Sequence, residues 1–347
     1  MYGRKRAPVT SFFLRAISLL YGLAIHVRRG LYSVGVLQRK KIAPFVISVG
    51  NLTLGGTGKT PAVMNIATVL LNAGKRPAVV SRGYGRLDEA SIVIVADGER
   101  MLVDSRTGGD EPVLIGSTIP RLPVVVGRDR VNAARLAQER FGIDAVILDD
   151  GFQHVRLRRD LDIVLVDAGD PFGTGNLFPA GILREPISAL NRADAVLITG
   201  VDRAADLALL RETIAKHAGA PIFSSRLVPK DLVEVMTGEV KQLASIRGVA
   251  VLALSGIARP APFQSLLGRL GADVREKLVF SDHHAYDRSD LAAVVRRAVD
   301  CNAGMIVTTE KDAARLRSLR PEGVWALRVE LVVDEQEEWK ALLIPRG

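Results

Sequence analysis

A glycine-rich loop, GGTGKT at positions 55–60, carries the clearest chemistry in this sequence. The backbone N–H groups of such a loop can turn inward around an anion, and the dipole of a following helix favours negative charge there. Lys59 would then reach the β- and γ-phosphates of a nucleotide, and the Thr60 hydroxyl would bind Mg²⁺. The spacing therefore predicts a loop that holds a nucleoside triphosphate.

The expected nucleotide-binding residues are Thr53, Leu54, Gly55, Gly56, Thr57, Gly58, Lys59 and Thr60. The usual motif has glycine six residues before the lysine, where this chain has Thr53, so the loop is a variant. The alternative is a glycine-rich strand-to-helix turn that binds no ligand, which would contain most of the same residues. The context favours the nucleotide, because an apolar β-branched segment (45–49) precedes the loop and a helical pattern follows it.

Two carboxylates end the apolar segment of AVILDDGFQH, at positions 145–154. A P-loop enzyme places a Mg²⁺-directed aspartate at such a strand end, so Asp149 and Asp150 are candidate metal ligands. Adjacent carboxylates repel each other unless a cation lies between them. Gln153 and His154 would project near the same edge as substrate contacts. The alternative is that the acidic pair only caps the next element.

A second acidic pair lies in the glycine turn GGDEP (108–112). One carboxylate of Asp110 and Glu111 could hold a metal ion while the other accepts a hydroxyl proton. A plain polar turn would have the same composition, so the residues alone leave both interpretations open.

The segment FSDHHAYD (280–287) concentrates Asp282, His283 and His284. An Asp–His pair could orient a base or a phosphoryl acceptor. A solvated surface loop could have the same residues, so both interpretations remain open. If His283 meets Asp110, we expect the contact to cross between two domains, because the residues are far apart in sequence. A zinc site would need further ligands.

Arg184, in the loop NLFPAGILREP (176–186), is a candidate phosphate contact. TTEKD (308–312) follows an apolar segment and only loosely resembles a guanine-reading turn. Its Lys311 and Asp312 are adjacent rather than separated by one residue, which argues against a GTPase.

These residues need elements to position them, and apolar segments alternate with helical ones along the chain. The segments expected to be strands are 77–82, 91–97, 122–127, 144–150, 161–168 and 194–200. Such alternation predicts an α/β, P-loop NTPase-like fold, with a mostly parallel sheet covered by helices on both faces. Ligands in these sheets bind at the carboxyl ends of the strands.

The pattern changes near residue 222, after which a second α/β unit follows. Its clearest strands are 248–257 and 304–312, and its clearest helices are 260–271 and 288–300. We therefore expect a lead-in with a helix at 1–44, a P-loop domain at 45–222, and a smaller α/β domain at 223–347 that closes over the active site.

The chain has 347 residues and one cysteine, Cys301, so no disulfide can form within it and a reducing compartment is expected. Of its 47 basic residues, 14 lie in residues 1–87, which contain no Asp or Glu. The rest of the chain is net acidic. This asymmetry predicts that the N-terminal quarter meets an anionic surface, either a membrane or a nucleic acid.

The segment 11–30 favours the membrane, because it is strongly apolar and its polar interruptions fall three or four residues apart. These are Ser11, Arg15, Ser18, Gly22, His26 and Arg29, with Arg4, Lys5 and Arg6 before them and Arg39, Lys40 and Lys41 after them. Such a helix suits an anionic membrane surface. A spanning helix and a helix packed on the protein's own core remain open, and no groove-reading motif supports nucleic acid.

Eight motifs occur together and in order: ISVGNLTLGGTGKTP, VVSRGYGR, GGDEP, DDGFQH, GNLFPAGILREP, SGIARPAPF, FSDHHAY and VTTEKD. This set closely resembles the tetraacyldisaccharide 4′-kinases, the lipid A 4′-kinases of Gram-negative bacteria. The resemblance covers the chain from the N-terminal helix to about residue 315. It implies that Thr53 is acceptable at the first position of the loop, because this family does not keep the first P-loop glycine.

The resemblance implies ATP- and Mg²⁺-dependent transfer to the 4′-hydroxyl of a tetraacylated glucosamine disaccharide 1-phosphate at the cytoplasmic face of the inner membrane. It implies that Asp110 is the base and that His283 assists it, with Asp282 alongside. Glu111 and the pair Asp149 and Asp150 fall at positions associated with metal and active-site polarity. No obligate protein partner is expected.

Two other functions remain open from the residues. One is a nucleotide-switched ATPase or GTPase that targets a membrane, and it would hydrolyse nucleotide without a lipid. The other is an ATP-dependent ligase with a similar GGTGKT loop, and it would not need residues 1–44.

Overall fold

The computed structural model describes residues 8–344, and their side chains from Phe13 onward. Arg4, Lys5 and Arg6 of the expected basic lead-in lie outside the described residues. The chain forms two compact units. Unit 1 contains the chain up to Arg82, Gly127–Arg226 and the chain from Val332 onward, and unit 2 contains Gly83–Val126 and Leu227–Leu331.

This division differs from the expected one, in which a single boundary near residue 222 separated two continuous domains. The chain passes between the units within strand β8 (Ile222–Glu234) and again within β13 (Val324–Val333). The segment Gly83–Val126 belongs to unit 2 because its helix α4 (Asp110–Thr118) packs against α9 (Glu310–Leu316). Apolar periodicity predicts local elements, although not β8 or β13, and it carries no signal for this long-range packing.

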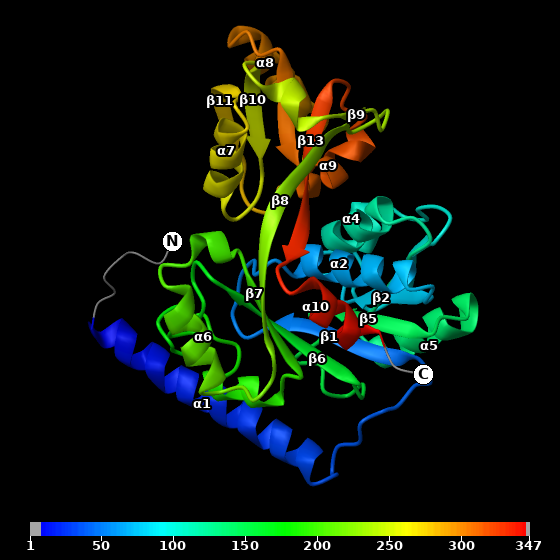
Figure 1. The fold of residues 1–347 in the computed structure, drawn as a ribbon, viewed down its shortest axis with the longest axis vertical. Helices are drawn as coiled ribbons and strands as arrows, with labels where there is room; N and C mark the ends of the chain where they lie inside the picture. Colours follow the sequence, from blue (N-terminus) through cyan, green and yellow to red (C-terminus); the bar gives the residue numbers. More distant parts are fainter. Residues whose placement is uncertain (1–7, 345–347) are drawn as a thin grey trace. The chain divides into compact units, whose positions relative to one another are not determined.

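Unit 1 contains a parallel sheet in the order β2-β5-β1-β6-β7-β8. Its strands are β1 (Phe45–Asn51), β2 (Pro77–Ser81), β5 (Ala145–Asp149), β6 (Leu161–Asp167), β7 (Ala195–Thr199) and the start of β8. Its helices are α2 (Lys59–Asn72), α5 (Arg130–Phe141), α6 (Leu207–Ala215) and α10 (Gln336–Leu343), as Figure 1 shows. The predicted mostly parallel α/β fold is confirmed.

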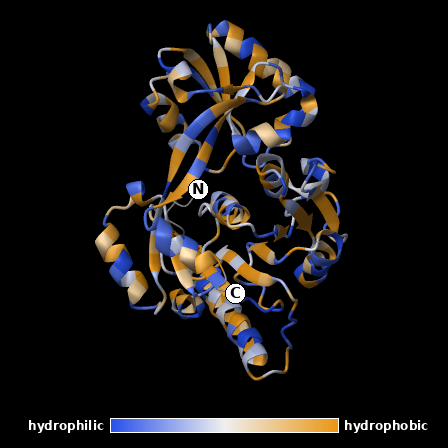
Figure 2. Cartoon of the chain, turned by 45° about the vertical axis from the view of Figure 1, so that its right-hand side comes forward, coloured by the Kyte–Doolittle hydropathy of each residue, from blue (hydrophilic) through white to orange (hydrophobic). Residues whose placement is uncertain are grey.

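The strands of this sheet form because they are apolar on both faces. All residues of β5, β6 and β7 are buried, and Figure 2 shows these strands coloured mainly as hydrophobic. The helix α2 covers the sheet with Ala62, Val63, Ile66, Ala67 and Leu70, which recur at helical spacing and are fully buried. This packing holds the start of α2 at the end of β1.

Unit 2 contains a parallel sheet in the order β11-β10-β12-β13, and an antiparallel pair of strands, β3 and β4. These strands are β3 (Val93–Asp97), β4 (Pro123–Val126), β10 (Ala250–Ser255), β11 (Asp273–Val279) and β12 (Met305–Thr309), and β9 (Val240–Lys241) pairs with β8. Besides α4 and α9, the helices are α3 (Ser105–Gly108), α7 (Pro260–Arg269) and α8 (Arg288–Asp300). Short 3₁₀ turns lie at Leu243–Ile246 and Arg317–Leu319 in unit 2, and at Ile187–Arg192 and Val201–Arg203 in unit 1.

The helix α1 (Pro8–Ser33), blue in Figure 1, belongs to unit 1. Of its polar stripe, Ser18 and Gly22 are buried, whereas Arg15 and His26 are exposed. Ser18 is 7% exposed, and its hydroxyl donates to Leu177 O (2.9 Å) and accepts from Ala180 N (3.0 Å). Leu19 and Leu20, by contrast, are 75% and 69% exposed. Among the described residues, no helix has the length and apolar character needed to cross a membrane.

Candidate active site

The glycine loop lies between β1 and α2, as the sequence predicts. Gly58 is the residue before α2 and has φ 81°, and Gly55 has φ 109°, both values that favour glycine. Lys59 and Thr60 therefore occupy the first turn of α2, where unpaired N–H groups and the helix dipole favour an anion. The loop has the backbone geometry of a phosphate-binding site.

Thr53 can replace the usual glycine because its backbone does not need a left-handed conformation. It forms an antiparallel bridge with Leu183, and Leu54 N donates to Ile182 O at 2.7 Å. Asn51 Nδ2 also donates to Thr53 O at 2.8 Å. The loop 176–186 thus braces the start of the nucleotide loop.

Lys59 and Arg184 share one carboxylate, that of Asp150. Arg184 Nη1 donates to Asp150 Oδ1 and Oδ2 at 2.9 and 2.8 Å, and Lys59 Nζ lies 3.5 Å from Oδ1. Burial would raise the pKa of Asp150, but the charges of Lys59 and Arg184 outweigh burial and lower that pKa. The cations expected near the acidic pair are therefore supplied in part by the protein itself.

Asp149 and the remaining residues of DDGFQH have different surroundings. Asp149 is buried at the end of β5 and accepts from Ser81 Oγ at 2.9 Å. Gln153 Nε2 donates to Asn51 O (3.0 Å) and to Glu185 Oε1 (3.2 Å). Gln153 thus joins the loop 176–186 to β1.

His154 does not join the Gln153 hydrogen bonds. Burial and the nearby positive charge of Arg130 lower the pKa of His154 to about 4, so the ring is neutral at pH 7. Its Nε2 atom is buried and makes no hydrogen bond within the described chain. The ring is therefore an uncharged polar group in a basic environment.

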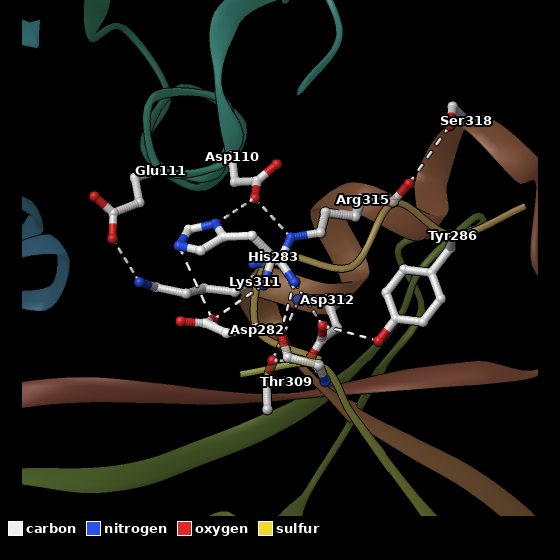
Figure 3. A network of polar contacts seen from close by, with 11 residues as sticks. Asp110, Glu111, Asp282, His283, Tyr286, Thr309, Lys311, Asp312, Arg315 and Ser318 are labelled. Carbon is white, nitrogen blue, oxygen red and sulfur yellow. Dashed lines mark hydrogen bonds and ion pairs between the residues drawn. The ribbon is translucent and has the colours of Figure 1, made fainter. Parts of the chain in front are cut away.

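Asp110 and His283, 173 positions apart, meet within unit 2. His283 Nδ1 lies 3.2 Å from Asp110 Oδ2, as Figure 3 shows. The expected contact is present, but the expectation that it crosses two domains is wrong, because both residues belong to unit 2. Asp282 accepts from His283 N at 3.1 Å. The structure thus brings together the turns that carry GGDEP and FSDHHAYD.

The charges of the pair are set by their mutual contact and by Arg315. The hydrogen bond to Asp110 raises the pKa of His283. Burial would raise the pKa of Asp110, but the bonds from His283 and Arg315 outweigh burial and lower it. Arg315 Nε donates to Asp110 Oδ2 at 2.6 Å. The pair is therefore biased toward carboxylate and imidazolium.

The neighbours of this pair bind other groups. Lys311 Nζ donates to Glu111 Oε1 at 2.5 Å. His284 Nε2 lies 2.8 Å from Asp290 Oδ2, and its ring packs 4.6 Å from that of Phe280. His284 is therefore part of the start of α8, whereas His283 belongs to the Asp110 cluster. Among residues 8–344, no group of three His, Cys, Asp or Glu side chains could hold a metal ion.

The sequence reasoning missed Arg315 and assigned no role to Asn51. Arg315 lies three residues after Asp312 on α9, and the two side chains are 3.0 Å apart. That spacing, which places charged residues on one helix face, is the signal that could have found Arg315. Asn51, at the end of β1, accepts from Lys59 Nζ at 3.2 Å.

The comparisons with known proteins agree over nearly the whole chain. The family described as tetraacyldisaccharide-1-P 4′-kinase matches residues 10–346. The tetraacyldisaccharide 4′-kinase of Syntrophus aciditrophicus is 41% identical and the alignment covers 98% of this chain and 94% of the relative. That of Pelobacter propionicus is 42% identical, with 91% and 87% covered.

Among solved structures, LpxK from Aquifex aeolicus in complex with ATP is similar, with a TM-score of 0.80 and 32% identity. The similarity covers 96% of this chain and 98% of that chain. Sequence and fold thus agree over nearly the whole chain. The chain belongs to the tetraacyldisaccharide-1-phosphate 4′-kinases, the kinase family of lipid A biosynthesis.

Proposed function

We propose that the chain transfers the γ-phosphoryl group of ATP to the 4′-hydroxyl of a tetraacylated glucosamine disaccharide 1-phosphate. The observation that carries the acceptor half of this proposal is the contact between Asp110 and His283. A carboxylate held beside an imidazole is the arrangement needed to accept a hydroxyl proton. ATP as donor is supported by the loop around Lys59 and by the ATP complex of the related LpxK from Aquifex aeolicus.

The nucleotide is held by unit 1 in this proposal. The backbone of residues 55–58 and the N-terminus of α2 surround the phosphates, and Lys59 neutralises the charge that develops on them. Thr60 and Asp149 offer the hard oxygen donors that Mg²⁺ prefers, and a bound Mg²⁺ would stabilise charge on the β- and γ-phosphates. Asp150 could join them only by releasing Arg184. Glu111, a further metal candidate in unit 2, binds Lys311.

The acceptor is activated by Asp110 in this proposal. Its carboxylate takes the proton of the 4′-hydroxyl as that oxygen attacks the γ-phosphorus, and the bond to the bridging β–γ oxygen breaks to leave ADP. The hydrogen bond to Asp110 raises the pKa of His283, which favours the imidazolium form that would offset the negative charge of the site. Gln153, His154 and Arg184 remain candidates for contacts to the substrate.

We also propose that α1 lies on the anionic cytoplasmic face of the inner membrane, where a lipid acceptor would be found. Its outward face is apolar, with Phe13, Leu19, Leu20 and Leu23 all more than 60% exposed. An apolar helix face binds the headgroup boundary, and each nearby cation adds roughly 1 kcal/mol at an anionic surface. The segment 39–41 supplies three exposed cations.

The experiment is transfer from [γ-³²P]ATP to detergent-dispersed tetraacyldisaccharide 1-phosphate, with the label followed in lipid and in inorganic phosphate. The proposal expects label in the lipid, and the loss of this signal in Asp110→Asn. Release of labelled phosphate without labelled lipid would instead support the membrane-targeting ATPase. The family match weighs against that function and against the ligase.

A further inference from the structure

Arg315 is a buried cation that has no role in the proposed phosphoryl transfer as described so far. Its side chain is 5% exposed, and it lies between two aspartates of unit 2 (Figure 3). Nε donates to Asp110 Oδ2 at 2.6 Å, and Nη1 donates to Asp312 Oδ1 at 3.0 Å and to Gly256 O at 2.8 Å. A buried guanidinium fixed at several atoms is held in one orientation.

Asp312, on the other side of Arg315, is fixed just as firmly. It is fully buried and accepts from Tyr286 OH (3.0 Å), Thr309 Oγ1 (2.7 Å) and Gly256 N (3.0 Å). Burial beside Asp312 raises the pKa of Tyr286, so the phenol stays a proton donor. Asp312 therefore anchors Arg315 to the end of β10 and the start of α9.

The consequence appears at the two oxygens of Asp110. Arg315 Nε and His283 Nδ1 both approach Oδ2, and within residues 8–344 no hydrogen bond reaches Oδ1. The Asp110 side chain is 20% exposed, so it is not sealed from a ligand. Asp282 lies beside His283, and Lys311 binds Glu111, so neither of these charged groups bonds to Oδ1.

We propose that Arg315 is a positioning residue for the phosphoryl transfer: anchored by Asp312, it holds Asp110 Oδ2 so that Oδ1 faces the acceptor hydroxyl. This inference rests on the proposed role of Asp110 as the base. Lysine cannot reproduce it, because a single ammonium cannot bind Asp110 and Asp312 with the fixed geometry of a guanidinium. Arg315 thus acts through Asp110 and need not touch either substrate.

The test is a double-mutant cycle with Arg315→Lys and Asp110→Asn, measured with ATP and the detergent-dispersed disaccharide 1-phosphate. Arg315→Lys should lower kcat by about 10²-fold, because small misplacements of a catalytic group have effects of that size. KM for ATP should change little. In the Asp110→Asn background, Arg315→Lys should have no further effect on the residual single-turnover rate.

Arg328→Lys is the matched control, because Arg328 forms a two-bond ion pair with Asp231 in the same unit, at 2.5 Å for each bond. Its kcat should stay at the wild-type value. Tyr286→Phe is the milder second variant, since it removes one donor to Asp312 and keeps Arg315. It should lower kcat in the same direction as Arg315→Lys, by less, and only when Asp110 is present.

Two results would overturn the inference. One is wild-type kcat in folded Arg315→Lys or Tyr286→Phe, with Asp110→Asn inactive. The other is an equal loss of rate from Arg315→Lys in both backgrounds. Wild-type kcat in Asp110→Asn itself would instead refute the proposed base, so the two failures are distinguishable.

Discussion

Asp150 and His283 share a backbone conformation that side chains rarely adopt. Their φ angles are 52° and 57°, in the left-handed region that favours glycine. Such a conformation costs roughly 1–3 kcal/mol and persists where the surroundings hold it in place. Asp150 is held by Arg184 and His283 by Asp110, so each of these two positions belongs to a candidate cluster. Positive φ also occurs outside the clusters, at Arg121, Asn302 and Arg320.

Lys59→Ala should abolish most turnover and leave the fold intact. Lys59 contributes its charge to the nucleotide phosphates, whereas Asp150 keeps its two bonds to Arg184 without it. Lys216→Ala is the matched control, because it removes an exposed lysine that forms an ion pair with Glu212 of α6. Transfer of labelled phosphate and the melting temperature are the measurements. Full turnover in folded Lys59→Ala would contradict the role of the loop.

His283→Ala and His284→Ala should have different effects. His283→Ala should lower turnover by about 10²-fold, since it removes the partner of the proposed base. His284→Ala should mainly lower the melting temperature, because His284 binds Asp290 and packs on Phe280. Steady-state rates and thermal unfolding of both variants separate the two roles. Equal rate losses with unchanged melting temperatures would contradict this assignment.

At the scale of elements, the loop 176–186 connects α1 with the nucleotide loop. Leu177 O and Ala180 N bind Ser18 of α1, and Leu183 pairs with Thr53. Arg184 in the same loop binds Asp150. One irregular segment thus contacts both α1 and the nucleotide loop. Its own backbone hydrogen bonds, such as Phe178 N to Leu183 O at 2.8 Å, help to fix its conformation.

The start of α9 carries a carboxyl group that its surroundings disfavour in the charged form. Burial raises the pKa of Glu310 to about 7, although Val329 N donates to it at 3.1 Å. Because the folded-state pKa lies above the unfolded value of about 4.3, the folded protein binds the extra proton between these values. Its stability therefore falls as pH rises through this range.

Glu310→Gln should therefore stabilise the protein at pH 8, by up to about 3 kcal/mol, and much less at pH 5. Glutamine is neutral at both pH values and can still accept from Val329 N. Denaturant unfolding at the two pH values measures the difference. Glu322→Gln, which removes the same charge from an exposed residue, is the control. A gain that is equal at both pH values would contradict the burial of a charged Glu310.

At the scale of the whole molecule, the basic excess and the exposed apolar residues coincide. Residues 1–87 contain 14 basic and no acidic residues, and α1 lies within them. Ser18 of its polar stripe is buried against the loop 176–186, whereas Arg15 and His26 of that stripe are exposed together with the apolar residues of the outward face. The protein thus presents exposed apolar residues on α1 close to a cluster of cations, which is the kind of surface that the proposed docking to an anionic membrane requires.

The double variant Leu19→Glu/Leu20→Glu should weaken binding to vesicles that contain phosphatidylglycerol. Both side chains are exposed, so the contacts of Ser18 with the loop 176–186 should persist. High salt should loosen the wild type only partly, because burial of apolar surface is not screened. Leu209→Glu on α6, 56% exposed, is the control. Co-sedimentation of the double variant equal to that of the wild type would refute membrane docking by α1.

The amino-acid sequence was enough to predict the nucleotide loop and many of the strands and helices. Glycines at positions that need positive φ, an apolar strand before Lys59 and a helical pattern after it are local signals, readable within about 20 residues. The same local signals predicted seven strands before residue 222, the strands β10 and β12, and the helices α7 and α8. They did not predict β8, β11 and β13, or the helices α4 and α9. The resemblance of eight motifs then identified the family that the comparisons confirmed.

Which distant side chains meet could not be predicted from local signals, because it depends on long-range packing. Packing of α4 on α9 assigned Gly83–Val126 to unit 2 and brought Arg315 to Asp110, 205 positions away. Packing of α1 on the loop 176–186 likewise turned Ser18 inward, although the spacing of Ser18 in the sequence fits a solvated stripe equally well. The physical reason is that periodicity defines the faces of a helix, whereas the choice of face and partner depends on contacts between distant segments.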